Sequence, residues 1–413
     1  MNNGLESFFC DNTSVLILGA GYVGTSLAIE CRRAGIRVAV YDRSEDALHL
    51  LATKSDCELV FDFANMTFVP RVCIIAVNTP VINHMPDYEP LNSAVSMLGS
   101  IIAPGMLIIN ESTVSPGITR DLIGRGLESI ANLSPMQDFM LSFSPERIDL
   151  GNSKFNLKTT PKLVAGITEE AAHQAISFYR LFVDDVSIAG TVEELEFTKL
   201  YENCYRAVGI GLANEISLAA TRLGLNASRI FAASATKPFG FEPFRPGSGV
   251  GGDCIPTDPW HLIASFNKID VSEYKILQAA LEMNESMPVR VAAAVDILIE
   301  NLKPAVESPR IVVLGLGYKP NQTSLMNSPA LALISILRRR YTQIAVYDPL
   351  LANSSRNMLD DVLFLGNNEL TNWNPTVGIL CVLHDCILER ASEIMFPLID
   401  STATLKGEQV YYV

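Results

Sequence analysis

The chain carries the stretch SVLILGAGYVG at residues 14–24. An apolar run followed by glycines in the spacing G-x-G-x-x-G predicts a buried strand that turns sharply into a helix. A helical pattern over residues 25–34 and a second apolar run over residues 37–41 follow, and the second run ends at Asp42. The order strand, glycine turn, helix, strand and acid is typical of a dinucleotide-binding βαβ unit.

The glycines of this turn permit a tight bend and the close approach of a pyrophosphate at the N-terminus of the helix. Asp42 would accept a hydrogen bond from a ribose hydroxyl, which favours NAD as the cofactor. The neighbouring Arg43 could accommodate a 2′-phosphate, so the sequence leaves NADP open.

Three more apolar runs, at residues 72–77, 106–109 and 139–143, each end in polar residues. Ligands of an open parallel sheet bind outside the carboxyl ends of the strands, so these polar residues are expected to line one crevice. Ordinary loop polarity would explain any single run, but three in succession favour a shared site. The residues predicted to hold the cofactor are Gly19, Gly21, Tyr22, Val23, Gly24, Asp42, Arg43, Thr79 and Thr113.

The composition predicts a multidomain globular protein. A chain of 413 residues, 48% of them hydrophobic, exceeds the size at which one core usually divides. With 31 basic and 45 acidic residues the net charge is -14, which argues against nucleic acid or a membrane surface as a partner. We find no signal-peptide pattern, and the eight cysteines have no framework spacing; both favour a cytoplasmic location.

The middle of the chain predicts a long helix from about residue 192 to 223. Lys199 and Asn203 lie one turn apart on it and can address one ligand, although a solvated face would look the same. Farther along, GVGGDCIPTDP at residues 249–259 places Cys254 on a bend where the thiol would be accessible as a nucleophile. A tight turn with a half-buried thiol is the structural alternative.

The last third of the chain repeats the first pattern. RIVVLGLGYKP at residues 310–320 gives a strand and a glycine turn, and a helix over 328–340 and a strand over 344–347 follow. We therefore predict an α/β fold with two Rossmann-like domains, built on parallel sheets and joined by a helical central region that contains the long helix. The predicted domains are an NAD-binding domain at 1–190, a helical central domain at 191–300 and a second Rossmann-like domain at 301–413.

A metal site is not expected. Cys381, His384 and Cys386 lie within six residues, but their spacing fits no standard zinc pair and the run over 377–383 is typical of a strand.

Taken together, these residues resemble the UDP-glucose/GDP-mannose dehydrogenase family over nearly the whole chain. The region from residue 201 to 256 is most similar to the branch that oxidises UDP-N-acetylhexosamines. The motifs that carry the resemblance are residues 19–24, 111–113, 144–147, Lys199 with Asn203, 236–241, the Cys254 run, 315–320 and 327–329.

The resemblance implies an NAD-dependent four-electron oxidation at C6 of a UDP-sugar, a UDP-N-acetylhexosamine or UDP-glucose, to the uronate. Asp258 and Lys199 would take up the proton of the first oxidation through a bound water. Cys254, activated by the charge of Lys199, would attack the aldehyde to form a thiohemiacetal, which is then oxidised to a thioester. Lys199 and Asn203 would hold the oxyanion.

Hydrolysis of the thioester is implied to use Glu146 with a water positioned by Thr113. The C-terminal domain is expected to bind the nucleotide diphosphate, and the central helix to form a homodimer. The implied substrate contacts are Glu146, Arg147, Lys199, Asn203, Phe244, Gly251 and Lys319.

Some positions depart from the family pattern. Asp253 stands before the cysteine where the hexosamine branch has histidine, and Asn78 stands where proline is common. Ser324 and Met326 replace an aspartate and an arginine. Two other functions therefore stay open: a catalytically silent nucleotide-sugar-binding homologue and a two-electron dehydrogenase of the hydroxyacid type.

Overall fold

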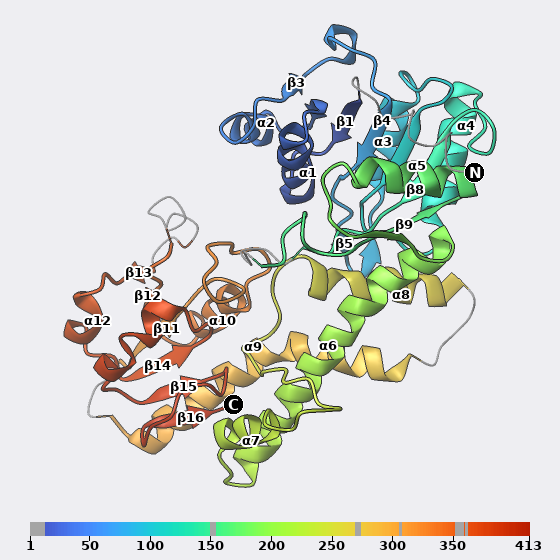
Figure 1. Cartoon of the computed structure of the whole chain (residues 1–413). Coiled ribbons are helices and arrows are strands. Elements are labelled where there is room, and N and C mark those ends of the chain that lie inside the picture. Colours follow the sequence, from blue (N-terminus) through green and yellow to red (C-terminus); the bar gives the residue numbers. More distant parts are fainter. Residues whose placement is uncertain (1–12, 149–153, 269–273, 305–307, 352–358, 360–361) are drawn as a thin grey trace. The chain divides into compact units, whose positions relative to one another are not determined.

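The structure is a computed structural model that describes residues 13–148, 154–268, 274–304, 308–351, 359 and 362–413 (Figure 1). The chain divides into two compact units, residues Met1–Glu202 with Trp260–Ser272 and residues Asn203–Pro259 with Glu273–Val413. The division falls within two helices, at residues 202/203 and 259/260, so the three-domain boundaries expected from the sequence stay predictions.

The first unit is built on an eight-stranded sheet with the order β10-β9-β8-β7-β4-β1-β2-β3. Neighbouring strands are parallel, as expected for a Rossmann-like domain, except for β8 and β9, which pair antiparallel. The short β9 and β10 were not predicted. The strands are β1 (Ser14–Leu18), β2 (Arg37–Tyr41), β3 (Glu58–Val60), β4 (Val72–Ile75), β7 (Leu107–Asn110), β8 (Met140–Phe143), β9 (Lys162–Gly166) and β10 (Val186–Ile188).

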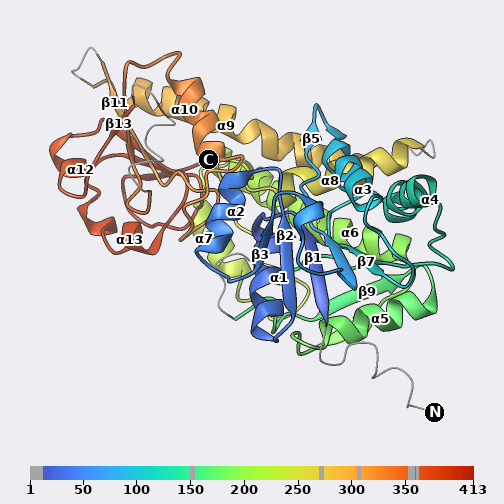
Figure 2. The same ribbon diagram turned by 90° about the horizontal axis from the view of Figure 1, so that it is seen from above.

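Helices cover both faces of this sheet because its central strands are apolar on both sides. Val15 and Ile17 of β1 face a core shared with one set of helices, and Leu16 and Leu18 face the other set, as the two-residue period of a strand requires. The two layers can be followed in Figures 1 and 2. The first layer is α1 (Tyr22–Arg33), α2 (Glu45–Ala52) and α5 (Glu169–Tyr179); the second is α3 (Glu89–Leu98) and α4 (Arg125–Ala131).

Short elements complete this unit. A two-stranded antiparallel hairpin follows β4, and one turn of π-helix precedes α4. Their bounds are η1 (Phe63–Asn65), β5 (Val81–Ile82), β6 (Met85–Pro86) and η2 (Thr119–Gly124).

Helix α6 (Val192–Arg222) matches the predicted long helix. Its first turns are fixed to the first unit by Glu196, which is fully buried. The carboxylate of Glu196 accepts hydrogen bonds from the backbone N–H groups of Gly117, at 2.5 Å, and Thr119, at 2.9 Å. Burial raises the pKa of Glu196 to about 7, because charging a buried carboxyl is costly. This anchor lies one turn before Lys199 and fixes its place.

The second unit is built on a six-stranded parallel sheet with the order β13-β12-β11-β14-β15-β16. One face packs against α9 and α10, and the other packs against α12 and α13. The strands are β11 (Arg310–Leu314), β12 (Gln343–Tyr347), β13 (Leu363–Phe364), β14 (Val377–Leu380), β15 (Leu398–Asp400) and β16 (Val410–Tyr412). The helices are α7 (Ala227–Ser234), α9 (Lys275–Leu302), α10 (Pro329–Leu337), α12 (Glu369–Asn372), α13 (Asp385–Leu388) and the turn η3 (Ala391–Glu393). Helix α8 (Cys254–Lys268) belongs to this unit up to Pro259 and to the first unit from Trp260 on.

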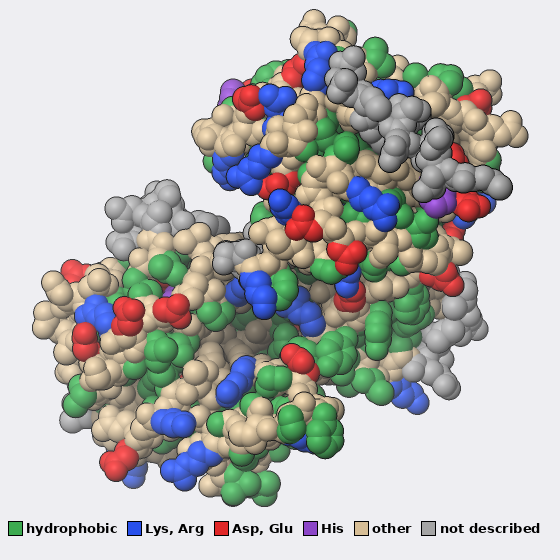
Figure 3. Space-filling view, viewed as in Figure 1, with side chains coloured by type: hydrophobic (Ala, Val, Ile, Leu, Met, Phe, Trp, Pro, Cys, Tyr) green, Lys and Arg blue, Asp and Glu red, His purple; other side chains and the backbone are tan. Residues whose placement is uncertain are grey.

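Basic and acidic side chains are intermixed on the face drawn in Figure 3. Within the described ranges, no helix combines the length and the apolar character needed to cross a membrane.

Candidate active site

The first glycine turn has the geometry expected of a phosphate-binding turn. Gly19 has φ 111°, and a Cβ there would lie 2.3 Å from the carbonyl oxygen of Ala76. A Cβ at Gly24 would lie 1.8 Å from the carbonyl oxygen of Gly19, so neither position accepts a side chain. A Cβ at Gly21 would meet nothing within 4 Å. The middle glycine therefore borders open space at the start of α1, where a pyrophosphate fits.

Asp42 lies just after β2 and is bonded to this turn. Its Oδ2 accepts a hydrogen bond from the backbone N–H of Ala20 at 2.6 Å, and its Oδ1 accepts one from Ser44 at 2.8 Å. Each carboxylate oxygen keeps a further lone pair for a ribose hydroxyl. Arg43 forms an exposed ion pair with Glu89 at 3.1 Å.

The loops after β4 and β7 meet beside this turn, as their predicted positions in one crevice required. The hydroxyl of Thr79 donates to the carbonyl oxygen of Thr113 at 2.6 Å. The hydroxyl of Ser112 donates to the carbonyl oxygen of Val77 at 2.8 Å. The two threonines predicted as cofactor contacts are thus direct neighbours.

His261 fixes the same loops and was missed by the sequence reasoning. Its Nε2 lies 3.1 Å from the carbonyl oxygen of Thr79, and its Nδ1 lies 3.0 Å from the hydroxyl of Tyr88. Because a carbonyl can only accept, Nε2 carries the proton, and the neutral ring leaves Nδ1 as an acceptor facing the Tyr88 hydroxyl. The backbone carbonyl of His261 also accepts from the hydroxyl of Ser115 at 2.7 Å. Burial lowers the pKa of His261 to about 4, so the ring is neutral in this network.

Glu146 and Lys199 lie together in the first unit. The ammonium group of Lys199 donates to the backbone carbonyl of Glu146 at 2.8 Å, and Lys199 is 7% exposed. The carboxylate of Glu146 accepts a short hydrogen bond from the backbone N–H of Ile148. Burial raises the pKa of Glu146, although Lys199 acts in the opposite direction. A raised pKa makes the carboxylate a stronger base, which suits a general base.

Arg147 follows Glu146 and is already paired. Its guanidinium group lies 2.8 Å from the carboxylate of Glu202 and 3.1 Å from the carbonyl oxygen of Pro161, to which it donates.

In the second unit, Asn203 of α6 and Asp258 of α8 are in contact. The side-chain amide of Asn203 donates to Oδ2 of Asp258 at 2.6 Å, and both side chains are buried. Cys254 is the first residue of α8 and is exposed. Residues four apart share a helix face, so Cys254 lies one turn before Asp258 on the same side of α8. The expected bend at Cys254 is thus the start of a helix.

The glycine loop before Cys254 packs on the second glycine turn. A Cβ at Gly251 would lie 2.7 Å from the Cβ of Tyr318, so glycine is required there. The backbone N–H of Gly252 donates to the carbonyl oxygen of Met326 at 2.9 Å, and the amide of Asn327 donates to the carbonyl oxygen of Gly252 at 2.9 Å. Met326, a departure from the family pattern, therefore binds the cysteine loop through its backbone.

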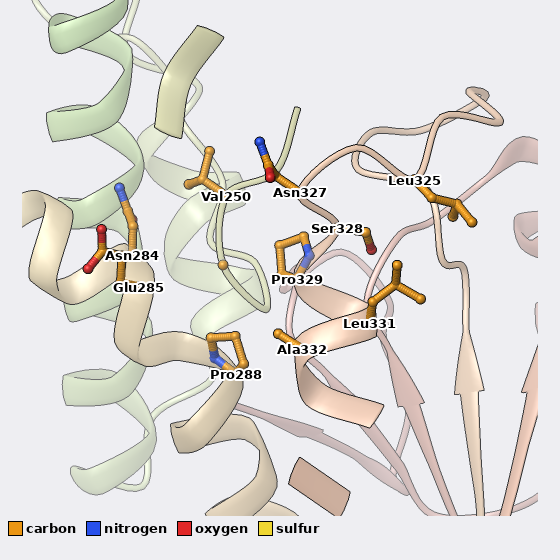
Figure 4. Close-up of a pocket in the computed structure, with 11 residues that line it drawn as sticks. Val250, Asn284, Glu285, Pro288, Leu325, Asn327, Ser328, Pro329, Leu331 and Ala332 are labelled. Atoms are coloured by element: carbon orange, nitrogen blue, oxygen red, sulfur yellow. The ribbon is translucent and has the colours of Figure 1, made fainter. Parts of the chain in front are cut away.

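A pocket of about 360 Å³ lies beside this loop. Figure 4 shows Asn284 and Glu285 of α9 on one side of it, Val250 on the loop, and Ser328 and Pro329 at the start of α10 on the other side. The pocket lies within the second unit and has both polar and apolar lining residues.

Two other predicted substrate contacts also lie in this unit. The ring of Phe244 is half-buried and packs edge-on against Tyr205 of α6, with ring centres 5.5 Å apart. Lys319 lies on the second glycine turn and is half-buried.

The second βαβ unit repeats the first in its hydrogen bonds. Oδ2 of Asp348, after β12, accepts from the backbone N–H of Leu316 at 2.7 Å. His384 lies 3.3 Å from the same oxygen through Nε2, and its Nδ1 accepts from the backbone N–H of Asn321 at 2.8 Å. Both ring nitrogens of His384 are thus engaged. Among the described residues, no group of three His, Cys, Asp or Glu side chains is placed to hold a metal ion.

Comparison with known proteins gives three matches to domains of one family. The NAD binding domain of the UDP-glucose/GDP-mannose dehydrogenase family matches residues 58–183, its central domain matches 193–286, and its UDP binding domain matches 312–406.

Individual proteins match over most of their length. UDP-N-acetyl-D-mannosamine dehydrogenase of Pyrococcus horikoshii is 33% identical over 356 residues, which is 81% of this chain and 83% of that protein. UDP-N-acetyl-D-glucosamine 6-dehydrogenase of Pseudomonas aeruginosa is 31% identical over 354 residues, 81% of this chain and 82% of that protein.

Solved structures of dehydrogenases that act on UDP-sugars have a similar fold over nearly the whole chain. The UDP-D-ManNAc dehydrogenase structure from P. horikoshii has a TM-score of 0.83 at 26% identity and covers 97% of this chain and 99% of its own. The UDP-glucose dehydrogenase structure from Pyrobaculum islandicum has a TM-score of 0.83 at 25% identity and covers 100% of this chain and 98% of its own.

The fold and the matched cofactor domain define an NAD-dependent oxidoreductase. More narrowly, the chain belongs to the UDP-glucose/GDP-mannose dehydrogenase family, as the resemblance of its motifs predicted. The cofactor is accordingly NAD.

Proposed function

We propose that this enzyme oxidises the C6 hydroxymethyl group of a UDP-sugar, a UDP-N-acetylhexosamine or UDP-glucose, to the carboxylate through a thioester on Cys254. The relatives named for UDP-N-acetyl-D-mannosamine and UDP-N-acetyl-D-glucosamine support the first substrate class. The observation that carries the proposal is helix α8. It presents an exposed Cys254 at its start and a buried Asp258, bonded to Asn203, one turn later.

NAD bound at the first glycine turn supplies the hydride acceptor for both oxidations. The turn residues Gly19, Gly21, Tyr22, Val23 and Gly24 would contact its pyrophosphate, and Asp42 its ribose. Thr79 and Thr113, joined by a 2.6 Å hydrogen bond, would border its reactive end.

In the first oxidation the C6 alcohol loses a hydride and a proton and becomes an aldehyde. Asp258 and Lys199 receive the proton through a water. Asp258 suits this role because its hydrogen bond from Asn203 leaves further lone pairs on the carboxylate.

The thiolate of Cys254 then adds to the aldehyde carbon, because an aldehyde has no hydride to give until a nucleophile adds. Lys199 and Asn203 hold the resulting oxyanion. When that oxygen reforms its carbonyl, the second hydride leaves and a thioester remains.

Hydrolysis completes the reaction. Glu146 takes a proton from a water held by Thr113 as the water attacks the thioester carbonyl. The C–S bond breaks and the Cys254 thiolate leaves. The raised pKa of Glu146 supports its role as this base. Each turnover converts one alcohol, two NAD and one water to one carboxylate, two NADH and three protons.

The remaining substrate contacts proposed here are Arg147, Phe244, Gly251 and Lys319. Gly251 and Phe244 lie in the second unit with the cysteine loop and α6, which supports their assignment to the sugar nucleotide.

We also propose a homodimer through α6, in the cytoplasm. Three apolar side chains of this helix within the second unit, and a fourth one residue past its end, are exposed to between 42% and 74%. Their spacing of seven, four and seven residues puts them on one face of a helix. A second copy of the same helix would cover this face. The residues are Tyr205, Leu212, Ile216 and Leu223.

The test is to incubate the purified protein with NAD and one UDP-sugar at a time, and to count the NADH formed per sugar consumed. The sugars are UDP-N-acetylmannosamine, UDP-N-acetylglucosamine and UDP-glucose. Two NADH and a uronate are expected with one of them. Binding without any NADH would instead favour a silent nucleotide-sugar-binding protein, and one NADH per sugar would favour a two-electron dehydrogenase.

A further inference from the structure

Beneath the segment that carries Glu146 lies a buried ion pair, which none of the proposed steps uses. The ammonium group of Lys162, the first residue of β9, lies 3.1 Å from Oε1 of Glu111, which follows β7. The side chains of Lys162 and Glu111 are 4% and 0% exposed. Tyr179 of α5 donates a short hydrogen bond to the same carboxylate, and its ring lies 4.7 Å below the ammonium group.

This pair is not arranged for stability alone. Burying two charges costs several kcal/mol per ion, which an ion pair recovers only when its remaining polar atoms are also bonded. Oε2 of Glu111 is buried and has no hydrogen-bond partner among the described residues. Apolar side chains of the same size often serve a core as well as such a pair does. The charge at Lys162 therefore calls for another explanation.

That explanation lies in what else Lys162 contacts. Its ammonium group donates to the backbone carbonyl of Pro145 at 3.4 Å, and Lys199 donates to the next carbonyl along the chain, that of Glu146, at 2.8 Å. The preceding residue is fixed as well, because the backbone N–H of Ser144 donates to the backbone carbonyl of Asn110 at 2.9 Å. Three successive residues are thus fixed by three different elements.

We propose that Lys162 is a positioning residue for Glu146: with Lys199, it fixes two consecutive carbonyls of the segment that presents the Glu146 carboxylate to the thioester. The inference rests on the proposed function. Glu111 and the aromatic ring of Tyr179, which phenylalanine would keep, orient Lys162 from the opposite side. The charges that face Glu146 are Lys199, Lys162 and Glu111, so the two lysines also favour its carboxylate form.

The test separates hydrolysis from the oxidations that precede it. Lys162→Met removes the ammonium group and keeps most of the volume. Stopped-flow NADH absorbance measures the two oxidations, and intact-protein mass spectrometry measures the acyl group on Cys254. Hydrolysis is expected to slow by at least about tenfold, so that the acyl form accumulates, while both oxidation rates stay within about twofold.

Because Lys162→Met leaves Glu111 buried and unpaired, the double variant Lys162→Met/Glu111→Gln provides a second, neutral version of the cluster. The matched control is Tyr179→Phe, which disturbs the same cluster but keeps the contact from Lys162 to Pro145. It should not accumulate the acyl form. Equal slowing of all steps, or accumulation equal to that in Tyr179→Phe, would overturn the role of Lys162. A wild-type enzyme that makes one NADH per sugar would instead overturn the proposed function.

Discussion

The side-chain amide of Asn203 donates a 2.6 Å hydrogen bond to the carboxylate of Asp258, and both groups are buried. A buried carboxylate needs such donors, since an unpaired one is costly. The contact joins α6 to the helix that begins at Cys254. It therefore links the predicted oxyanion contact to the predicted proton acceptor.

Replacing Asn203 by alanine should both weaken the fold and slow the first oxidation. Asp258 would lose the 2.6 Å hydrogen bond from Asn203, so we expect the free energy of unfolding to fall by about 1–3 kcal/mol. Urea unfolding and the first NADH burst measure the two effects. The control is Ser217→Ala on the same helix, because the buried hydroxyl of Ser217 has no partner among the described residues. Equal behaviour of the two variants would contradict the assignment.

The two glycine turns offer a matched pair of aspartates. Asp42 accepts from the backbone N–H of Ala20 at 2.6 Å, and Asp348 accepts from that of Leu316 at 2.7 Å. Asp42→Asn turns one acceptor into a donor and should weaken NAD binding about tenfold, whereas Asp348→Asn should leave it unchanged. Calorimetric titration with NAD measures both. An unchanged affinity in Asp42→Asn would rule out the ribose contact.

His261 should make stability depend on pH in a defined direction. Burial lowers its pKa to about 4, against about 6.5 in an unfolded chain. Between these values the unfolded chain binds more protons, so the stability that the neutral ring contributes is present above about pH 6.5 and is lost as the pH falls towards 4. The loss is of the order of 3 kcal/mol.

The variant His261→Phe removes this titration. Its unfolding free energy should therefore fall less steeply than that of the wild type between pH 6.5 and pH 4, as measured by urea unfolding at each pH. His84→Ala serves as a control, because His84 is an exposed histidine that stacks on Trp260 beside it. Parallel curves for wild type and His261→Phe would show that the ring is not held neutral.

The apolar face of α6 predicts the oligomeric state. Leu212 is 58% exposed and Ile216 is 42% exposed. Placing glutamate at both positions would put charges into a self-complementary interface, so we expect monomers in sedimentation analysis. Glu300 is an exposed charge on α9, outside this face of α6, and Glu300→Lys should leave the dimer intact. A wild-type protein that sediments as a monomer would refute the interface.

The sequence predicted the central strands well because their signal is local. The bounds of β2 agree with the apolar run over residues 37–41, and β1 and β11 are the apolar runs that precede the two glycine turns. The starts of helices were harder. Helix α1 begins at Tyr22 rather than residue 25, because Gly21 and the tyrosine turn into the helix without a capping side chain. The start of α8 at Cys254 was also not predicted, because the prolines after Cys254 are typical of a turn. A helix nevertheless accepts proline in its first turn.

Residues that act through tertiary contacts left no signal in the sequence. His261 belongs to no motif, and its partners Thr79 and Tyr88 lie far from it along the chain. Lys162 opens a short strand that pairs antiparallel with β8, and that pairing has no periodic pattern long enough to predict. By contrast, Lys199 and Asn203 were predictable as one helix face because their spacing is a property of the helix itself.

The most direct test of the account replaces the nucleophile. With the UDP-sugar that the wild type oxidises, Cys254→Ala should still bind NAD and substrate but should form no uronate, and it should release at most one NADH per sugar. Product analysis by mass spectrometry together with NADH absorbance gives both values. A Cys254→Ala enzyme that releases two NADH and makes the uronate would contradict the thioester mechanism.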